Sequence, residues 1–186
     1  MARAKPTKST KSSAGEGKSD AISLLETDHR MVEDMFEQFK AETDQAQKQE
    51  LATQICKSLR IHTMLEEEIF YPAYLAATGD TETHHQAKVE HEGASRLIEE
   101  IEQSSPADEY FDAKVNVLAD MIEHHVTEEE QPGGMFSEAS ETEDMDLDAL
   151  GEQIAARKAE LESTFIPGGE PPASVGRGDE RAEQPM

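Results

Sequence analysis

Two peptides in the sequence repeat one arrangement of metal-binding side chains, a histidine followed four residues later by a glutamate. Residues at positions i and i+4 share one helix face and lie about 6 Å apart along the axis, so both side chains can reach one cluster. A further histidine precedes each pair by 33 or 34 residues. The sequence therefore holds two copies of a half-site, and the candidate ligands are His29, His62, Glu66, His91, His125 and Glu129.

The two glutamates occupy positions at which apolar residues are expected. An unpaired buried carboxylate costs several kcal/mol, so it is tolerated only beside positive charge, and neither stripe supplies an inward Lys or Arg. A bound cation resolves this conflict. Six imidazole and carboxylate ligands are too many for one tetrahedral zinc site and suit two metal ions bridged by carboxylates. Without a thiolate, iron fits best, and manganese or zinc fits less well.

Four segments carry these residues on apolar stripes with spacings of three and four, the pattern of amphipathic helices. The stripes are Ile22, Leu25, His29, Val32, Phe36 and Phe39; Leu51, Ile55, Leu59, His62, Glu66, Ile69 and Ala73; His84, Ala87, His91, Ala94, Ile98 and Ile101; and Phe111, Val115, Leu118, Ile122, His125 and Glu129. Short connections predict an all-α, antiparallel up-down-up-down four-helix bundle. A weaker stripe at Leu147, Leu150, Ile154 and Leu161 predicts a short fifth helix laid on the bundle.

Proline and glycine indicate where these helices begin and end. Pro72 lies inside the second pattern and should kink or end that helix near Ile69, because proline has no N–H to donate. Ser-Pro at 105–106 is a good start for the fourth helix. The Pro-Gly-Gly sequence at 132–134 should end it just after Glu129.

Composition then divides the chain into four parts. Residues 1–18 read as a disordered basic leader and 166–186 as a disordered tail rich in Pro and Gly. Between them we predict the bundle at 19–136, followed by an acidic linker and the C-terminal helix at 137–165.

Charge and cysteine content restrict the partners and the compartment. The net charge is −24, and because residues 1–18 carry +4, the rest of the chain carries −28. A body this acidic repels phosphate backbones, so we expect no nucleic-acid partner for it. No apolar run approaches the roughly 18 residues that span a bilayer, and no signal peptide is visible, so no membrane partner is expected. The single Cys56 excludes an intramolecular disulfide and fits a cytoplasmic protein.

The ordered set of six candidate ligands, with the IFYP sequence that follows Glu66, resembles the hemerythrin-like (HHE cation-binding) family over roughly residues 20–136. The resemblance implies an antiparallel four-helix bundle around two non-haem iron ions, Fe2+ or Fe3+, joined by an oxo or hydroxo bridge and by the two glutamates. Members of the family carry or sense oxygen, or handle peroxide, nitric oxide or iron.

The chain departs from the oxygen carriers of this family in two ligands. The carriers have a fifth histidine one turn before the residue that matches His91, and here that position is Ala87. They also have an aspartate five residues after the last histidine, where this sequence offers Glu129 at four. A vacancy at Ala87 leaves a position open, or filled by water or by a bent-in His84, and an open position favours exchange and redox chemistry.

The register of the second half-site stays open, and the exposure of two glutamates is predicted from periodicity alone. His124 with Glu128 is the competing register for the second half-site, because Gln-Pro-Gly-Gly at 131–134 replaces the IFYP packing found after the first. Glu67 and Glu68 rotate away from the stripe of Glu66, so we expect both to be solvated helix surface.

We therefore expect a metal-binding protein whose di-iron site binds or senses oxygen or a related small oxidant such as peroxide or nitric oxide. The alternatives are an enzyme that acts on peroxide or nitric oxide, and an iron-handling or structural bundle stapled by metal. The pattern favours a metal- and oxygen-binding protein over an enzyme, and it indicates no particular protein partner or oligomeric state.

Overall fold

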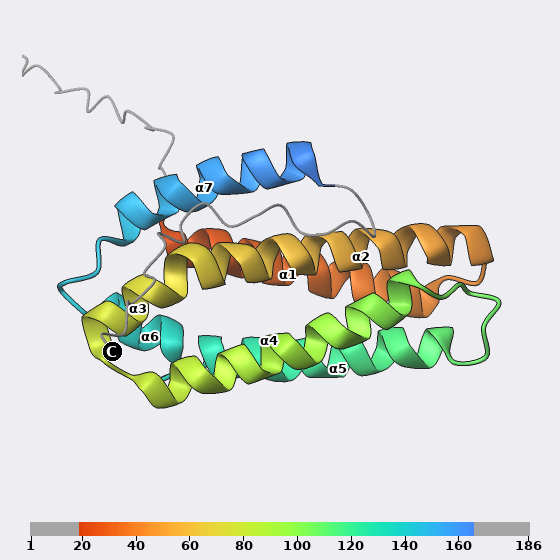
Figure 1. Ribbon diagram of the computed structural model, residues 1–186, viewed down its shortest axis with the longest axis horizontal. Helices are drawn as coiled ribbons and strands as arrows, with labels where there is room; N and C mark the ends of the chain where they lie inside the picture. Colours follow the sequence, from red (N-terminus) through yellow and green to blue (C-terminus); the bar gives the residue numbers. More distant parts are fainter. Residues whose placement is uncertain (1–18, 166–186) are drawn as a thin grey trace, which may run out of the picture.

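The computed structural model describes residues 19–165, and all regular secondary structure in that range is helical (Figure 1). The elements are α1 (Ala21–Ala41), α2 (Gln45–Leu65), the π-helical turn η1 (Glu66–Phe70), α3 (Tyr71–Thr78), α4 (Thr81–Glu102), α5 (Phe111–Glu130), α6 (Met135–Glu141) and α7 (Leu147–Thr164). The predicted leader at 1–18 and tail at 166–186 lie outside the described residues. The predicted all-α class is confirmed.

Four long helices, α1, α2, α4 and α5, form the antiparallel bundle that the stripes predict (Figure 1). Consecutive helices pack as two hairpins, α1 with α2 and α4 with α5, and the hairpins meet along α2–α4 and α1–α5. Aspartate side chains cap the starts of three of them by accepting backbone N–H groups, at Asp20, Asp44 and Asp80.

The apolar core has two parts, and the buried polar residues lie between them on each helix. In α1, His29 separates Leu25 of one cluster from Val32 of the other. In α4, His91 likewise separates Ala87 from Ala94. The bundle therefore holds its polar residues in the interior, away from both ends of the core.

The sequence predicts that Pro72 kinks or ends the helix that contains Glu66 near Ile69, and in the structure the α-helical geometry is interrupted at Glu66–Phe70 although the helix does not end. It continues through one π-helical turn into α3, and the N–H of Tyr71 donates to the carbonyl of Glu66, five residues back. This turn adds one residue to the helical period, so the buried face moves from the predicted Ile69 and Ala73 to Phe70, Tyr71 and Tyr74, each 0% exposed. Periodicity alone could not foresee that shift. 

Two other element boundaries also differ from prediction. Helix α5 begins at Phe111, because residues 105–110 form a turn in which the N–H of Ser105 donates to Asp108 Oδ2 at 2.7 Å. The acidic segment predicted as a linker begins with α6, whose Phe136 and Ala139 are buried against the core.

Helix α7 is longer than the short helix predicted and lies along the outside of α1 and α2 (Figure 1). Its Gly151 approaches the start of α1 so closely that a Cβ atom there would lie 2.6 Å from the carbonyl oxygen of Ser19. Ile154 and Leu161 are buried at this contact. Within the described residues, no helix is both long and apolar enough to cross a membrane.

Candidate metal centre

The structure brings together all six residues predicted as ligands, in the interior of the bundle. Each is at most 6% exposed. One histidine comes from each long helix, and the glutamates come from η1 and from α5. The six are His29 on α1, His62 on α2, Glu66 on η1, His91 on α4, and His125 and Glu129 on α5.

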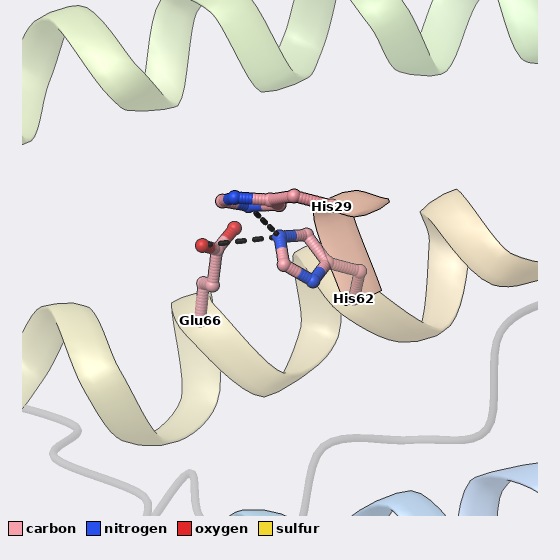
Figure 2. Close-up of side chains that lie close together, drawn as sticks. All are labelled: His29, His62 and Glu66. Atoms are coloured by element: carbon pink, nitrogen blue, oxygen red, sulfur yellow. Dashed lines mark hydrogen bonds and ion pairs between the residues drawn. The ribbon is translucent and has the colours of Figure 1, made fainter. Parts of the chain in front are cut away.

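The cluster consists of two half-sites with the same internal geometry. In the first, His29 Nε2 lies 3.0 Å from His62 Nε2, and His62 Nε2 lies 3.2 Å from Glu66 Oε1. Figure 2 shows these three side chains converging, with His62 and Glu66 on one face of their helix and His29 reaching across from α1. In the second half-site, His91 Nε2 lies 3.1 Å from His125 Nε2.

The two glutamates connect the half-sites. Glu66 Oε2 lies 3.3 Å from His91 Nε2, on the opposite hairpin from its own helix. Glu129 Oε2 lies 3.5 Å from His29 Nε2, and its Oε1 lies 3.6 Å from His125 Nε2. Each carboxylate therefore presents oxygen atoms to both half-sites, as a carboxylate that bridges two ions must.

Each of the four histidines also has a carboxylate at its outer nitrogen, Nδ1. The Nδ1–oxygen distances are 2.7 Å for His29 to Glu130, 3.8 Å for His62 to Asp28, 3.3 Å for His91 to Glu67, and 2.7 Å for His125 to Glu90. In three of them the carboxylate is within hydrogen-bond distance of Nδ1, holds the proton there and leaves Nε2 free to act as a ligand. His62 Nδ1 makes no hydrogen bond, and Asp28 acts on it by its charge. The arrangement turns all four Nε2 atoms inward.

Glu67 and Glu68 are therefore not the solvated surface that the sequence predicted. Glu67 contacts His91 and also lies 3.3 Å from Lys88 Nζ. Glu68 forms an ion pair with Arg157 of α7, at 2.8 Å. Positions one residue from a helical stripe still face neighbouring helices, which the sequence alone did not identify.

Three of the four outer carboxylates are paired with a cationic side chain. Glu130 pairs with Arg30, Glu67 with Lys88, and Asp28 with Lys158 of α7. Glu90 differs, because its neighbours within the described chain are His124, His125, Gln86 and Glu128, and it forms no ion pair there with Arg or Lys. The first half-site is also covered by α6, since the ring of Phe136 stacks on that of His29 with centroids 5.8 Å apart.

Tyr71 is a functional candidate that sequence reasoning treated only as packing. Its side chain is fully buried, and its hydroxyl donates to Glu129 Oε1 at 2.9 Å. The same hydroxyl lies 3.2 Å from His91 Nε2 and 3.4 Å from Glu66 Oε2. Its position five residues after Glu66 and directly before a proline was the available signal, but only the π-helical turn brings it onto the inner face.

Burial and mutual charge shift the ionisation of the histidines in opposite directions. Burial lowers the pKa of His62, but Glu66 and Asp28 outweigh it and raise the pKa to about 10. The same balance with Glu66 and Glu67 raises the pKa of His91 to about 9. Burial and the neighbouring charge of His62 lower the pKa of His29 to about 4.

The pKa values of the two glutamates are also shifted in opposite directions. Burial and the charge of Glu66 raise the pKa of Glu129 to about 7. Burial also opposes ionisation of Glu66, but His62 and His91 outweigh it and hold the pKa of Glu66 well below its usual range. Ionised Glu66 therefore requires positive charge beside it, and in the metal-free protein protons on His62 and His91 supply it.

The donor atoms fit divalent cations. Imidazole nitrogens lie about 2.1 Å from a bound zinc ion, so two that share one ion at a right angle are about 3.0 Å apart, the separation seen in each half-site. Glu66 Oε1 and Glu129 Oε2 are buried and make no hydrogen bond. His29, His62 and Glu66 form one possible ligand group, and Glu66, His91 and His125 form another.

The positions left open by the sequence have distinct surroundings. His125 and Glu129 face the cluster, whereas His124 is 64% exposed. Ala87 is buried and lines a cavity of about 150 Å³ together with His125 and Glu129. The ring of His84 packs edge-on against Tyr71, with centroids 6.0 Å apart, and lies outside both ligand groups.

Comparisons with known proteins agree with this architecture. A family model, the hemerythrin HHE cation-binding domain, matches residues 20–132. A curated protein of Nostoc sp. named DNA nickase is 33% identical over 107 residues, which cover 58% of this chain and 30% of that protein, so this chain spans less than a third of its length. The crystal structure of an HHE cation-binding domain-containing protein from Mycobacterium kansasii has a TM-score of 0.65 and 21% identity, covering 76% of this chain and 86% of that one, and it shares the fold.

Proposed function

Because the chain belongs to the hemerythrin HHE cation-binding domain family, we propose that its buried cluster holds two non-haem iron ions and binds or senses oxygen or a related small oxidant. The observation that carries this proposal is the pair of possible ligand groups that share Glu66. His29 and His62 would hold one ion, and His91 and His125 the other, with Glu66 and Glu129 between them. When bound, such a pair of ions supplies two electrons to an oxidant.

A small apolar cavity beside the cluster favours a small, neutral molecule as the ligand. It has a volume of about 20 Å³, room for roughly one water-sized molecule. Its lining combines the three imidazoles His29, His62 and His91 with six aliphatic side chains, and Asp28 and Thr63 also border it; the aliphatic residues are Val32, Leu59, Ala94, Ile98, Ile122 and Val126. An apolar space of this size suits oxygen or nitric oxide and disfavours charged or larger molecules.

Tyr71 would supply a hydrogen bond at the other side of the cluster. Burial and the charges of Glu66 and Glu129 raise the pKa of Tyr71 well above its ordinary value, so the phenol keeps its proton. Its O–H points at Glu129 Oε1 and lies near Glu66 Oε2, so it donates hydrogen bonds where negative charge gathers. We assign it the role of orienting the bridging carboxylates.

Turnover of peroxide or nitric oxide is the second candidate function, and the cavity at Ala87 is the observation that favours it. This cavity is lined by polar groups, among them Glu90, Glu128 and Gln86, and it reaches His125 and Glu129. An accessible, polar approach allows ligands and water to exchange, whereas reversible oxygen carriage benefits from a closed, dry site. 

The acidic charge of the chain argues against extending DNA nicking from the Nostoc protein to this one. The net charge of −24 includes the basic residues at 1–18, and the remainder repels a phosphate backbone. The shared region covers only 30% of that protein. We therefore propose a small oxidant as the ligand of the cluster.

The deciding experiment loads metal-free protein with Fe(II) without oxygen and then admits air. We expect about two irons per chain, as the donor set suggests, and a near-UV band of an oxo-bridged di-ferric pair. Fewer than one iron per chain and no such band would contradict the proposal. Steady-state consumption of peroxide that is lost in His62→Ala would favour the enzyme, whereas a single stoichiometric reaction would favour binding or sensing.

An Ala87→His variant also distinguishes turnover of an oxidant from binding or sensing, because it fills the open position of the site. The cavity at Ala87 has room for an imidazole near the second half-site. If the open position is what permits turnover, the added histidine should slow peroxide consumption while iron content stays the same. If metal only staples the fold, no oxidant should alter the iron spectrum, and metal should affect only the melting temperature.

A further inference from the structure

Helix α5 carries a second His-x3-Glu pair, one residue out of step with the buried one. His124 and Glu128 lie on the outer side of the helix, with His124 Nε2 3.4 Å from Glu128 Oε1 and 4.0 Å from Glu90 Oε1 of α4. One ligand atom from each of the three residues falls within 4.8 Å of the others. This is the register that the sequence offered as a competitor for the buried site, and the structure leaves it as a separate group.

Glu90 joins this outer group to the buried cluster. Its Oε2 lies 2.7 Å from His125 Nδ1, while its Oε1 faces His124. The other three carboxylates at histidine Nδ1 atoms are each neutralised by Arg or Lys, whereas in the described chain Glu90 has no such ion pair. The amide of Gln86 donates to both Glu90 and Glu128, which holds the two carboxylates together without adding positive charge. 

The cavity at Ala87 extends from this group to the buried cluster. Glu90 and Glu128 line it beside His125 and Glu129. Glu129 is 3% exposed, and its Oε2 is buried without a hydrogen bond. That oxygen lies 3.5 Å from His29 Nε2 and belongs to the buried cluster, so the cavity joins the outer group to a residue of the buried centre.

We propose that Glu90, His124 and Glu128 form a surface site for a divalent metal ion, and that an ion bound there passes through the cavity at Ala87 into the buried centre. The loading role rests on the proposed function, because that function supplies the destination. One imidazole and two carboxylates suit Fe2+, Mn2+ or Zn2+, and the exposed side leaves positions for water. A site with so few protein ligands binds weakly and releases its ion, as a point of entry requires.

The test compares two double variants of the full chain. His124→Ala with Glu128→Gln removes the outer pair but leaves Glu90, which contacts His125. His85→Ala with Glu123→Gln is the matched control, since both residues are exposed on the same two helices and lie outside all three possible ligand groups. Circular dichroism and melting temperature should be the same for both variants, which excludes unfolding as a cause.

The first measurement is Mn2+ binding, followed by electron paramagnetic resonance, to protein whose buried centre is already saturated with iron. We expect one weak Mn2+ site per chain in the wild type and in the control, and its loss in the His124/Glu128 variant. Equal Mn2+ binding by all three proteins overturns the surface site.

The second measurement is the rate at which Co2+ enters metal-free protein, followed by the visible absorbance of the bound ion. Acidic clefts raise the association rates of cations by 10-fold or more, so the His124/Glu128 variant should load about tenfold more slowly. The final number of Co2+ ions in the buried centre should be unchanged. An unchanged rate overturns the loading role and leaves the proposed function standing. Failure of the wild type to take up any ion in the buried centre would overturn both the proposed function and the loading role.

Discussion

Glu66 and Tyr71 are the two ends of one π-helical turn, and both side chains reach the same cluster. The N–H of Tyr71 donates to the carbonyl of Glu66, and the phenol oxygen lies 3.4 Å from Glu66 Oε2. In an α-helix, residues five apart do not share a face. The wider turn is therefore what allows a proposed bridging carboxylate and a hydrogen-bond donor to come from one short peptide, and π-helical turns are frequent at functional sites.

Replacing Tyr71 with Phe should impair the reactivity of the centre without preventing metal binding. The change keeps the buried ring and removes only the hydroxyl that contacts Glu129, Glu66 and His91. Loss of such a supporting hydrogen bond typically costs about 10–100-fold. We expect unchanged iron content and a reaction with oxidant slowed by about that factor, measured by stopped-flow absorbance. Tyr74→Phe is the control, because Tyr74 donates to Glu138, outside the cluster, and equal rates in both variants would contradict the role of Tyr71.

Replacing Glu67 with Gln should weaken metal binding. It removes the negative charge from Nδ1 of His91 and from Lys88, so His91 becomes a poorer and less firmly oriented ligand. We expect a loss of roughly tenfold in affinity, measured by competition with a chelator. Glu68→Gln is the matched control, because Glu68 pairs with Arg157 and contacts none of the four histidines. Equal affinities for the two variants would show that the outer carboxylate has no influence.

The stability of the metal-free protein should fall as the pH rises above neutrality. His62 and His91 have folded-state pKa values of about 10 and about 9, above the ordinary value of 6.5. A raised histidine pKa stabilises the fold fully below pH 6.5, and that stabilisation is lost as the pH rises through the folded value. We therefore expect the melting temperature of metal-free protein to drop between pH 7 and 10. With metal bound, the imidazoles are already neutral and the drop should be smaller, so parallel curves with and without metal would contradict the prediction.

Cys56 should be unreactive in the folded protein. Burial raises the pKa of its thiol to about 12, with a further contribution from Glu102, so almost no thiolate is present at pH 8. A chromogenic disulfide reagent should label about one thiol per chain after unfolding in guanidinium and almost none before. Rapid labelling of the native protein would show that this part of the core opens readily.

Replacing Gly151 with Ala should destabilise the protein by displacing α7. A Cβ atom there would lie 2.6 Å from the Ser19 carbonyl oxygen, and overpacking of this kind costs about 1–3 kcal/mol. Gly93→Ala is the control, since its new methyl group would meet only the flexible end of Met121, at 3.0 Å, and Ala favours a helix interior by about 0.5–1 kcal/mol over Gly. Chemical denaturation should therefore give shifts of opposite sign, and a neutral Gly151→Ala would show that α7 adjusts freely.

The sequence was sufficient to predict the four long helices and to select the six residues that converge. Burial of one helix face dominates the pattern there, so polar residues on a stripe, such as His62 and Glu129, were recognisable as inward-facing. The choice between His125 and His124 also followed from the strength of that stripe.

The features that the sequence did not reveal depend on contacts between distant segments. Tyr71 faces the cluster only because a π-helical turn interrupts the α-helical period. Glu67 lies one position from its stripe, and its contact with His91 depends on how closely α2 and α4 approach. Helix α6 is short and rich in acidic residues, so its few apolar side chains, such as Phe136, did not stand out from a linker composition.

Helices α6 and α7, which follow residue 132, are needed to transfer this centre intact to another protein. The family match ends there, yet Phe136 of α6 stacks on His29, and Lys158 of α7 neutralises the carboxylate beside His62. A fragment cut at the family boundary would keep every proposed ligand and lose both supports. For grafting the centre onto another protein, the unit that keeps both supports is residues 19–165 rather than the bundle alone.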